Sequence, residues 1–295
     1  MTDPSGHQEK LDDRTTAANS AIEIGEDRQT IVQLDPDHPG FRDAEYRTRR
    51  NTIAQIAHDF EPGTPVPDAP YVDEEHGVWR TIRDALASAH ERHACAEYRR
   101  VADQLDLPWD RIPQLREVSE RLQGMTGFRL EPVGGLVHPK VFLSHLGAGC
   151  FLSTQYIRHH SAPMYTPEPD VVHELLGHAC TLASPVLCEL NRQVGRAAAR
   201  ATSHEGLERL GRVYWFSIEF GVLREAGAVR AFGAGLLSSA GELEAMHDAE
   251  LRPFDTALME QQDYDVTRYQ PILFCADSQD QMVSELTRYL TDWAG

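Results

Sequence analysis

The chain has 295 residues, enough for one large domain or two small ones with a substantial buried core. Hydrophobic residues make up 41% and charged residues 25%, the composition of an ordinary globular protein. Asp and Glu total 46 against 28 Lys and Arg, and the resulting formal charge of −18 repels phosphate backbones and anionic lipid, which argues against a nucleic-acid partner.

The sequence has none of the features of a secreted or membrane protein. Its five cysteines are scattered and form no CxxC pair, so neither a disulfide framework nor a thiolate zinc cluster is expected. The polar N-terminus lacks the basic start and apolar run of a signal peptide. No apolar stretch approaches the roughly 20 residues that a membrane span needs. We therefore expect a cytoplasmic protein that does not bind membranes.

The first 33 residues differ in composition from the rest. They are rich in Asp, Glu, Thr, Ser and Gln and have few large apolar side chains. Such a segment cannot bury enough surface to offset the entropy lost on ordering, so residues 1–33 are predicted to be a disordered acidic tail. Order is expected to begin near the turn residues 35–40 (DPDHPG), and residues 34–295 are predicted to form a single domain.

Helices dominate the first half of this domain. Apolar residues at helical spacing run from 41 to 60, and a Pro-rich connector follows at 61–70. Asp73 is the candidate N-cap of a long helix, and Pro113 is expected to open a shorter helix that ends near residue 125. Residues 128–133 (FRLEPV) alternate apolar and polar side chains, which predicts a short strand.

The second half continues this pattern. A helix is predicted to begin near Val171, after the Pro-rich segment 166–170, and a long apolar-periodic helix is predicted over roughly 205–224. The Gly- and Ser-rich residues 232–239 are expected to form a loop or strand-turn, and a last helix runs from about 279 to 293. The predicted fold class is mainly α with a few short β-strands.

Two histidines form half of a candidate metal site. They lie five residues apart in the segment His173-Glu174-Leu175-Leu176-Gly177-His178. In a regular α-helix positions i and i+5 point about 140° apart, whereas the zinc-peptidase motif HExxH keeps its histidines at i and i+4 on one face. We expect Gly177 to end the helix or take positive φ and so bring His178 back towards His173. The alternative is one buried helix with two separately hydrogen-bonded histidines.

Glu219 is a candidate third ligand. It sits in the almost wholly apolar run 213–223 (VYWFSIEFGVL), where an ionised carboxylate is costly unless it is paired or bound to a cation. Its alternatives are an ion pair with Arg224 or a place on an exposed helix face. Two histidines and one carboxylate are the ligand set of non-haem iron(II) oxygenases, and the same set also serves catalytic zinc. Composition and spacing leave both metals open.

Arg158 is a candidate for substrate binding. It lies shortly before the histidine motif and could pair with Asp170, which would hold its guanidinium ready to bind a substrate carboxylate. A surface ion pair is the alternative. His159 and His160, next in the chain, are expected to be loop or surface residues rather than ligands.

Several long motifs in order resemble the aromatic amino-acid hydroxylases, the phenylalanine, tyrosine and tryptophan hydroxylases. They are QYIRHHSAPMYTPEPDVVHELLGH at 155–178, YWFSIEFG at 214–221 and GAGLLSSAGEL at 233–243. Similar segments extend from LDPDHPGFRDAEYRTRR at Leu34 to YQPILFCADS ending at Ser278. The resemblance implies a single hydroxylase-type catalytic domain over 34–295 that uses Fe(II), a tetrahydropterin and O2.

The resemblance also implies roles for individual residues. The iron ligands fall on His173, His178 and Glu219, and Ser238 matches a residue that orients the first histidine. Glu174, Phe142 and Tyr214 match positions that face the pterin. The amino-acid carboxylate is expected at Arg158, supported by Asp170 and Thr166. The pocket for the substrate ring is expected to be lined by Pro169, Trp215, Phe220, Gly235 and Val266.

By the same resemblance, Trp215 together with Val266 favours L-phenylalanine as the substrate and L-tyrosine as the product. Tyrosine 3-hydroxylation and tryptophan 5-hydroxylation are the alternatives on the same scaffold, since an apolar pocket discriminates one hydroxyl only modestly. A zinc hydrolase with Glu174 as general base and a non-catalytic binding protein are more distant alternatives. The first conflicts with the extra residue between the histidines, and the second with intact candidates at all three ligand positions.

The chain also departs from the animal enzymes of this family. It is expected to lack both their N-terminal regulatory domain and their C-terminal tetramerisation helix, so a monomer is expected, with a dimer as the alternative. Ala179, Cys180 and Thr181 replace the usual Val-Pro-Leu after the second histidine, and Leu152 replaces a histidine on the pterin side. Residues 141–149 also differ from the usual pterin-binding loop.

Overall fold

The computed structural model describes residues 22–24, 30–32 and 34–295 of the chain. The predicted disordered tail, residues 1–33, lies largely outside the described residues. Within it the backbone is described only for strands β1 (Ile22–Ile24) and β2 (Thr30–Val32), which pair antiparallel. The prediction for the rest of the tail stays a prediction.

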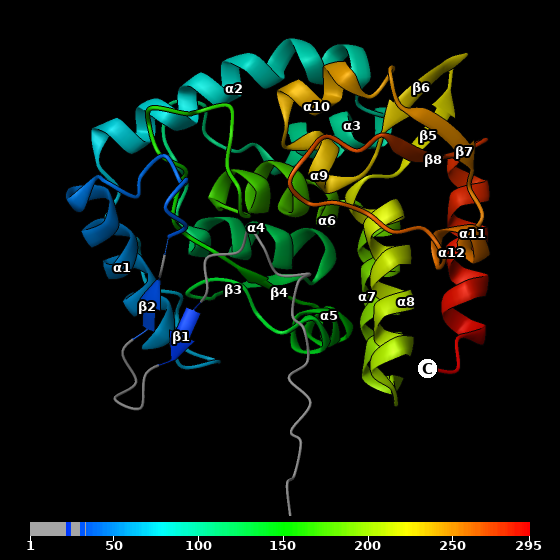
Figure 1. Ribbon diagram of the computed structural model, residues 1–295, viewed down its shortest axis with the longest axis horizontal. Helices are drawn as coiled ribbons and strands as arrows, with labels where there is room; N and C mark the ends of the chain where they lie inside the picture. The colour runs from blue at the N-terminus through cyan, green and yellow to red at the C-terminus, as the bar shows by residue number, and fades with distance from the viewer. Residues whose placement is uncertain (1–21, 25–29, 33) are drawn as a thin grey trace, which may run out of the picture.

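Helices make up most of the described chain, as Figure 1 shows. The α-helices are α1 (Ala44–His58), α2 (Asp73–His93), α3 (Ala96–Leu105), α4 (Leu115–Thr126), α5 (Pro139–Gly147), α6 (Cys180–Leu182), α7 (Pro185–Arg200), α8 (His204–Tyr214), α9 (Ala234–Leu237), α10 (Ala240–Ala245), α11 (Thr256–Met259) and α12 (Gln279–Asp292). Two segments are π-helical, η1 (His173–Ala179) and η2 (Trp215–Glu219). The predicted fold class, mainly α with a few short strands, is confirmed.

The strands form two further small sheets. Strands β3 (Arg129–Pro132) and β4 (Cys150–Ser153) pair in parallel. A four-stranded sheet has the order β6-β5-β8-β7, with strands β5 (Val222–Glu225), β6 (Ala228–Ala231), β7 (Glu250–Pro253) and β8 (Ile272–Ala276). Only β5 and β6 run antiparallel within it. They form a hairpin whose two turn residues, Ala226 and Gly227, both have positive φ, as a tight turn of this kind requires.

A continuous apolar core joins these elements. Helix α2 crosses one end of the molecule above α9 and α10, while α7, α8 and α12 pack together on one side (Figure 1). The buried face of α2 consists of Val78, Trp79, Ile82, Leu86 and Ala89, which recur at helical spacing. The segments η1 and η2 lie inside this framework, and six of the seven residues of η1 are buried. The candidate site therefore sits on rigid, packed elements.

Several predicted boundaries need correction. The helix expected over 205–224 ends at Glu219, and Val222–Glu225 is strand β5. Gly221 lies between the two. A larger residue does not fit at this position, because a Cβ would lie 2.4 Å from the Ser217 carbonyl oxygen and 2.2 Å from the Phe232 ring. Residues 232–239, expected as a loop or strand-turn, contain the short helix α9.

Smaller shifts occur at two helix starts. Asp73 is the first residue of α2 rather than its cap, which is Val72. Helix α4 begins at Leu115, two residues after Pro113. Helices α3, α5 and α7 and strands β4 to β8 were not predicted from the sequence at all.

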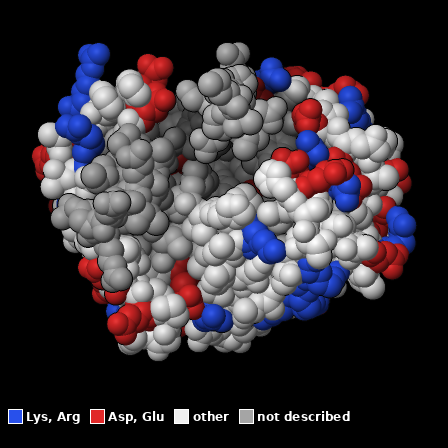
Figure 2. All heavy atoms as spheres, turned by 60° about the horizontal axis from the view of Figure 1, so that its bottom comes forward, with Lys and Arg blue, Asp and Glu red and all other residues white. Residues whose placement is uncertain are grey.

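Figure 2 shows one face of the molecule, on which side chains of both charges occur. On the face shown in Figure 2, Lys and Arg side chains are interspersed with Asp and Glu, and the described residues there form no extended basic surface of the kind that nucleic acid needs. No helix in the described part of the chain is long and apolar enough to cross a bilayer.

Candidate active site

The π-helical form of η1 brings the two histidines together. In a π-helix the backbone hydrogen bonds span five residues, so side chains five apart become neighbours, as those four apart are in an α-helix. The Nε2 atoms of His173 and His178 consequently lie 3.0 Å apart. The expected convergence is confirmed, but its expected cause is wrong, because Gly177 neither ends the helix nor has positive φ.

Gly177 is required for close packing instead. A Cβ at this position would lie 2.6 Å from the carbonyl oxygen of Ala234 in α9. Glycine thus allows the backbone of η1 to rest directly on α9. This contact places Ser238, the residue that ends α9, with its Oγ 2.9 Å from Nδ1 of His173. With Nδ1 bonded to a hydroxyl, Nε2 is the ring nitrogen of His173 available for a metal.

Glu219 completes the cluster from η2. Its Oε1 lies 2.9 Å from Nε2 of His178 and its Oε2 lies 3.7 Å from Nε2 of His173. Burial would raise the pKa of Glu219, but His178 and His173 outweigh burial and hold this pKa below its ordinary value. The carboxylate is therefore ionised where three donor atoms meet.

These donors fit a divalent transition metal. Burial and the neighbouring His178 lower the pKa of His173 to about 4, so its imidazole is neutral and has a lone pair to donate. Two imidazoles and one carboxylate on one side of a metal are a typical iron(II) ligand set that leaves coordination positions open. The Arg224 pairing considered for Glu219 is wrong, because Arg224 is exposed and faces Asp277.

Glu174 lies beside the histidines and is buried. Its Oε1 accepts hydrogen bonds from the Thr154 backbone N–H (3.3 Å) and hydroxyl (3.1 Å). Burial raises the pKa of Glu174 to about 7. A carboxylate oxygen of Glu174 also lies within 4.8 Å of a ring nitrogen of each histidine. Thr154 was not identified from the sequence, since a lone threonine carries no signal of this contact.

Phe142 and Tyr214 form an aromatic wall near Glu174. Their ring centroids lie 6.3 Å apart, and Phe142 packs on Phe151 at 5.4 Å. Phe151 in turn packs on the ring of His178 at 4.5 Å. The wall thus continues from the metal ligands to α5 and β4, and the structure brings the two expected pterin-side aromatic residues together.

Arg158 and Asp170 form the predicted pair. The guanidinium donates from Nε to Oδ2 and from Nη2 to Oδ1, each at 2.8 Å, and the Arg158 backbone N–H donates to Oδ2 at 2.8 Å. Asp170 is fully buried. Burial alone would raise its pKa, but Arg158 holds the pKa below its ordinary value. Asp170 also accepts from the His173 backbone N–H at 3.3 Å, so one carboxylate positions both Arg158 and the start of η1.

Thr166 and Pro169 lie in the segment before η1. The hydroxyl of Thr166 donates to the Glu168 carbonyl at 2.8 Å and so shapes the backbone of this segment. The Pro169 carbonyl accepts from the Thr154 hydroxyl at 3.4 Å. Neither side chain bonds to Arg158 in the described contacts, and both act on the loop that carries Asp170.

Trp215, Phe220 and Gly235 meet as expected for a ring pocket. The rings of Trp215 and Phe220 lie 4.5 Å apart, and a Cβ at Gly235 would lie 2.6 Å from the Phe220 ring. Two residues missed in the sequence complete the cluster. Tyr264 stacks on Trp215 at 4.2 Å, and Gln270 accepts from the Trp215 indole N–H at 3.1 Å.

Val266 is a predicted pocket residue that the structure does not bring into this cluster, and no described contact joins Pro169 to it either. Its side chain is 50% exposed, whereas Trp215 packs on the core and Phe220 is buried. In the sequence Val266 lies between Tyr264, which stacks on Trp215, and Gln270, which accepts a hydrogen bond from Trp215. It therefore belongs to the loop beside the ring cluster.

Comparison with known proteins identifies the family. A sequence profile described as biopterin-dependent aromatic amino acid hydroxylase matches residues 16–294. Phenylalanine 3-hydroxylase of Streptomyces coeruleorubidus is 44% identical over 245 residues, which cover 83% of this chain and 88% of that protein. Phenylalanine-4-hydroxylase of Homo sapiens is 42% identical over 253 residues, which cover 84% of this chain and 56% of the human protein. The chain thus spans little more than half of the human relative.

The fold has a solved counterpart. Chromobacterium violaceum phenylalanine hydroxylase, solved with iron(III) and 7,8-dihydrobiopterin, aligns with a TM-score of 0.72 at 29% identity, over 77% of this chain and 84% of that chain. The profile covers most of this sequence, and two relatives exceed 40% identity over more than four fifths of it. This chain belongs to the biopterin-dependent aromatic amino acid hydroxylase family.

Proposed function

We propose that the chain hydroxylates the ring of L-phenylalanine, giving L-tyrosine, and that it uses Fe(II), a tetrahydropterin and O2. The observation that carries the proposal is the meeting of two imidazoles and one carboxylate within 3.7 Å. A buried, preorganised arginine and an aromatic cluster accompany it. The zinc-hydrolase alternative has no support from the relatives, whose names describe hydroxylases.

In this proposal His173, His178 and Glu219 hold the iron. Ser238 accepts the Nδ1 proton of His173 and so fixes the ring with Nε2 towards the metal. Iron and the tetrahydropterin together supply the activation of O2. The protein contributes the positions of the ligands and a buried, water-poor surrounding.

Glu174, Phe142 and Tyr214 are the proposed pterin contacts. Because the pKa of Glu174 is about 7, its carboxyl group can donate a hydrogen bond to a polar heterocycle or accept one from it at neutral pH. The flat rings of Phe142 and Tyr214 offer an apolar face beside it. The two rings stand at 82° to each other, so one ring face and one ring edge would border a planar bicyclic cofactor.

Arg158 is the proposed partner of the substrate carboxylate. Its Nε and Nη2 bonds to Asp170 fix the guanidinium plane, and each terminal nitrogen keeps a further N–H for the substrate. Asp170 and Thr166 act by positioning Arg158 and its loop. Trp215, Phe220, Pro169 and Gly235 are proposed to surround the substrate ring, with Val266 at its edge.

One assay tests the proposal. Protein loaded with Fe(II) is given tetrahydrobiopterin, O2 and an equimolar mixture of phenylalanine, tyrosine and tryptophan, and the products are separated by chromatography and identified by mass spectrometry. We expect tyrosine as the main product. A Glu219→Gln variant should lose activity and bound iron, whereas Glu208→Gln, an exposed change on neighbouring α8, should retain both.

Other outcomes are equally informative. A 3-hydroxylated product would instead match the activity in the name of the Streptomyces relative, which is 44% identical. Hydroxylated tyrosine or tryptophan as the main product would assign the substrate to one of those amino acids. The absence of any hydroxylated product in fully iron-loaded protein would refute the function altogether. Sedimentation of the same sample tests the prediction of a monomer.

A further inference from the structure

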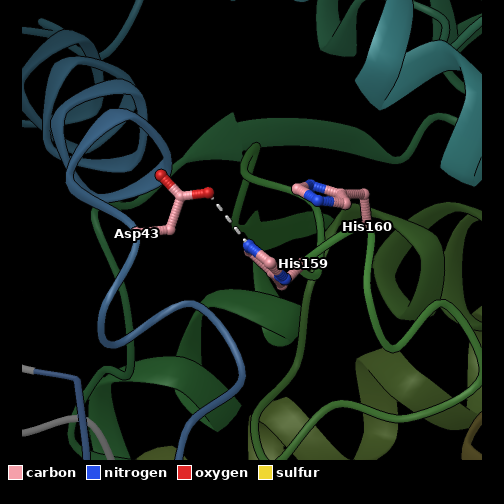
Figure 3. Close-up of side chains that lie close together, drawn as sticks. All are labelled: Asp43, His159 and His160. Carbon is pink, nitrogen blue, oxygen red and sulfur yellow. Dashed lines mark hydrogen bonds and ion pairs between the residues drawn. The ribbon is translucent and has the colours of Figure 1, made fainter.

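A second cluster of metal-ligand side chains lies outside the active site. Asp43, His159 and His160 each offer one donor atom, and these three atoms lie within 4.8 Å of one another (Figure 3). We propose that this cluster binds a divalent transition-metal ion of the zinc type. The site would join the start of α1 to the loop that follows Arg158. None of the three residues is a proposed iron ligand, and Arg158, next to His159 in the chain, lines the cavity beside them.

The ligand at the start of α1 is already oriented by hydrogen bonds. Asp43 caps α1, and its Oδ1 accepts the backbone N–H groups of Glu45 (2.9 Å) and Tyr46 (3.0 Å). Its Oδ2 faces His159 and lies 3.2 Å from Nε2. Oδ1 thus accepts the helix N–H groups, and Oδ2 points towards His159.

His159 is held in place like a metal ligand. Its ring is buried and packs edge-on against Tyr46, with the ring centroids 4.9 Å apart. Gly40 packs against the same ring, because a Cβ at position 40 would lie only 3.1 Å from it. The Ser161 backbone N–H donates to Nδ1 at 3.2 Å and the Ser161 Oγ lies 2.7 Å from it, so metal binding at Nε2 would move the ring proton to Nδ1, where Oγ can accept it. A hydroxyl behind the ring repeats the arrangement of Ser238 behind His173.

His160 and Glu74 lie on the open side of the cluster. The His160 ring stands 4.2 Å from that of His159, and its Nδ1 lies 3.2 Å from Oε2 of Glu74 at the start of α2. Both side chains are exposed, so each can rotate to bring its donor atom to the metal ion. Ligands at about 2.0–2.1 Å from a tetrahedral zinc are roughly 3.3 Å apart, and Asp43 and His159 already have this spacing. Glu74 would supply the fourth ligand.

The surrounding charge favours a cation. A cavity beside the cluster is lined by four carboxylates, Asp43, Glu45, Glu74 and Glu75, and by two guanidinium groups. Both guanidinium groups are engaged, Arg49 with Glu75 and Arg158 with Asp170. Asp43 and Glu74 lie 3.2 Å from His159 and His160, respectively. Nitrogen ligands select zinc-type ions over magnesium or calcium.

The test is the number of zinc ions bound per chain. Metal-free full-length protein is equilibrated with Zn2+, and bound zinc is measured by equilibrium dialysis and mass spectrometry. Wild type is expected to bind one zinc more than His160→Gln, which removes an exposed ligand without touching the core. Asp43→Asn should lose the same equivalent, because Asn keeps the helix cap but lacks the charge.

Two controls separate this site from the iron site. His204→Gln changes an exposed histidine on α8 and should bind as much zinc as wild type. His173→Gln should lose zinc at the iron site and keep the equivalent that His160→Gln removes. Zinc should also raise the melting temperature of His173→Gln, and the rise should vanish when His160→Gln is added. Equal zinc binding by wild type, His160→Gln and Asp43→Asn would overturn the proposal.

Discussion

Arg158 is buried with its guanidinium held in plane by Asp170. A lysine cannot form two parallel bonds with one carboxylate, so Arg158→Lys should leave Asp170 partly unpaired and misplace the positive charge. We expect kcat/KM for phenylalanine to fall by about 10²-fold, mainly through KM, the size expected when a buried charge-assisted pair is broken. Steady-state kinetics check this. Arg224→Lys, an exposed control, should change little, and an unaltered KM in Arg158→Lys would rule out the assigned role.

Ser238 contacts His173 on the side of the ring away from the proposed metal, and its hydroxyl also donates to the Gly235 carbonyl at 3.1 Å. Removing its hydroxyl should free the His173 ring to rotate and to take the other tautomer, which typically costs 10–100-fold in metal affinity. Ser238→Ala should therefore show weaker Fe(II) binding by that factor, with circular dichroism unchanged. Competition with a chelator measures the affinity. Ser284→Ala on α12 is the control, and equal iron affinity in both variants would contradict the assignment.

At the scale of elements, the contact between η1 and α9 decides the geometry of the iron site. Gly177→Ala would place a methyl carbon 2.6 Å from the Ala234 carbonyl, and rigid backbone on both sides leaves little room to yield. We expect the free energy of unfolding to fall by about 1–3 kcal/mol, as for other overpacked cores. Iron affinity should also fall, because α9 carries Ser238.

Gly211 offers a matched control for this prediction. It lies within α8, and a Cβ there would meet no atom within 4 Å. Gly211→Ala should raise the free energy of unfolding by about 0.5–1 kcal/mol through helix propensity. Denaturant unfolding measures both variants. Equal stability of Gly177→Ala and Gly211→Ala would show that the close contact of η1 with α9 does not restrict the side chain at position 177.

For the whole molecule, the partly buried carboxyl of Glu242 is expected to contribute to the dependence of stability on pH. Burial raises the pKa of Glu242 to about 7, from 4.5 in the unfolded chain, and the Gln270 N–H opposes this only in part. The folded state therefore binds the proton more tightly. The contribution of Glu242 to stability is complete below about pH 4.5 and is lost as pH rises through 7.

Glu242→Gln tests this dependence. Glutamine stays neutral, so the variant should be more stable than wild type at pH 8 by about 2 kcal/mol and lose this advantage below pH 5. Urea unfolding at a series of pH values measures the difference. Glu250→Gln, at an exposed position, should show no such gain at pH 8. A constant difference between Glu242→Gln and wild type from pH 5 to 8 would contradict the prediction.

The sequence by itself determined which residues are candidates. Apolar periodicity located α1, α2, α4 and α12 within a few residues, because an α-helix that packs on a core must repeat its buried face. The cost of an unpaired charge in an apolar run marked Glu219, and proximity in the chain paired Arg158 with Asp170. All these signals are local.

Only the tertiary structure decided how the candidates meet. The π-helical register of η1 and the glycine that lets it rest on α9 depend on non-local packing, and α-helical periodicity cannot express them. For the same reason Thr154 next to Glu174, Tyr264 on Trp215, and Asp43 against His159 gave no signal in the sequence. Asp43 and His159 are 116 residues apart, and only the packing of α1 on the Arg158 loop joins them.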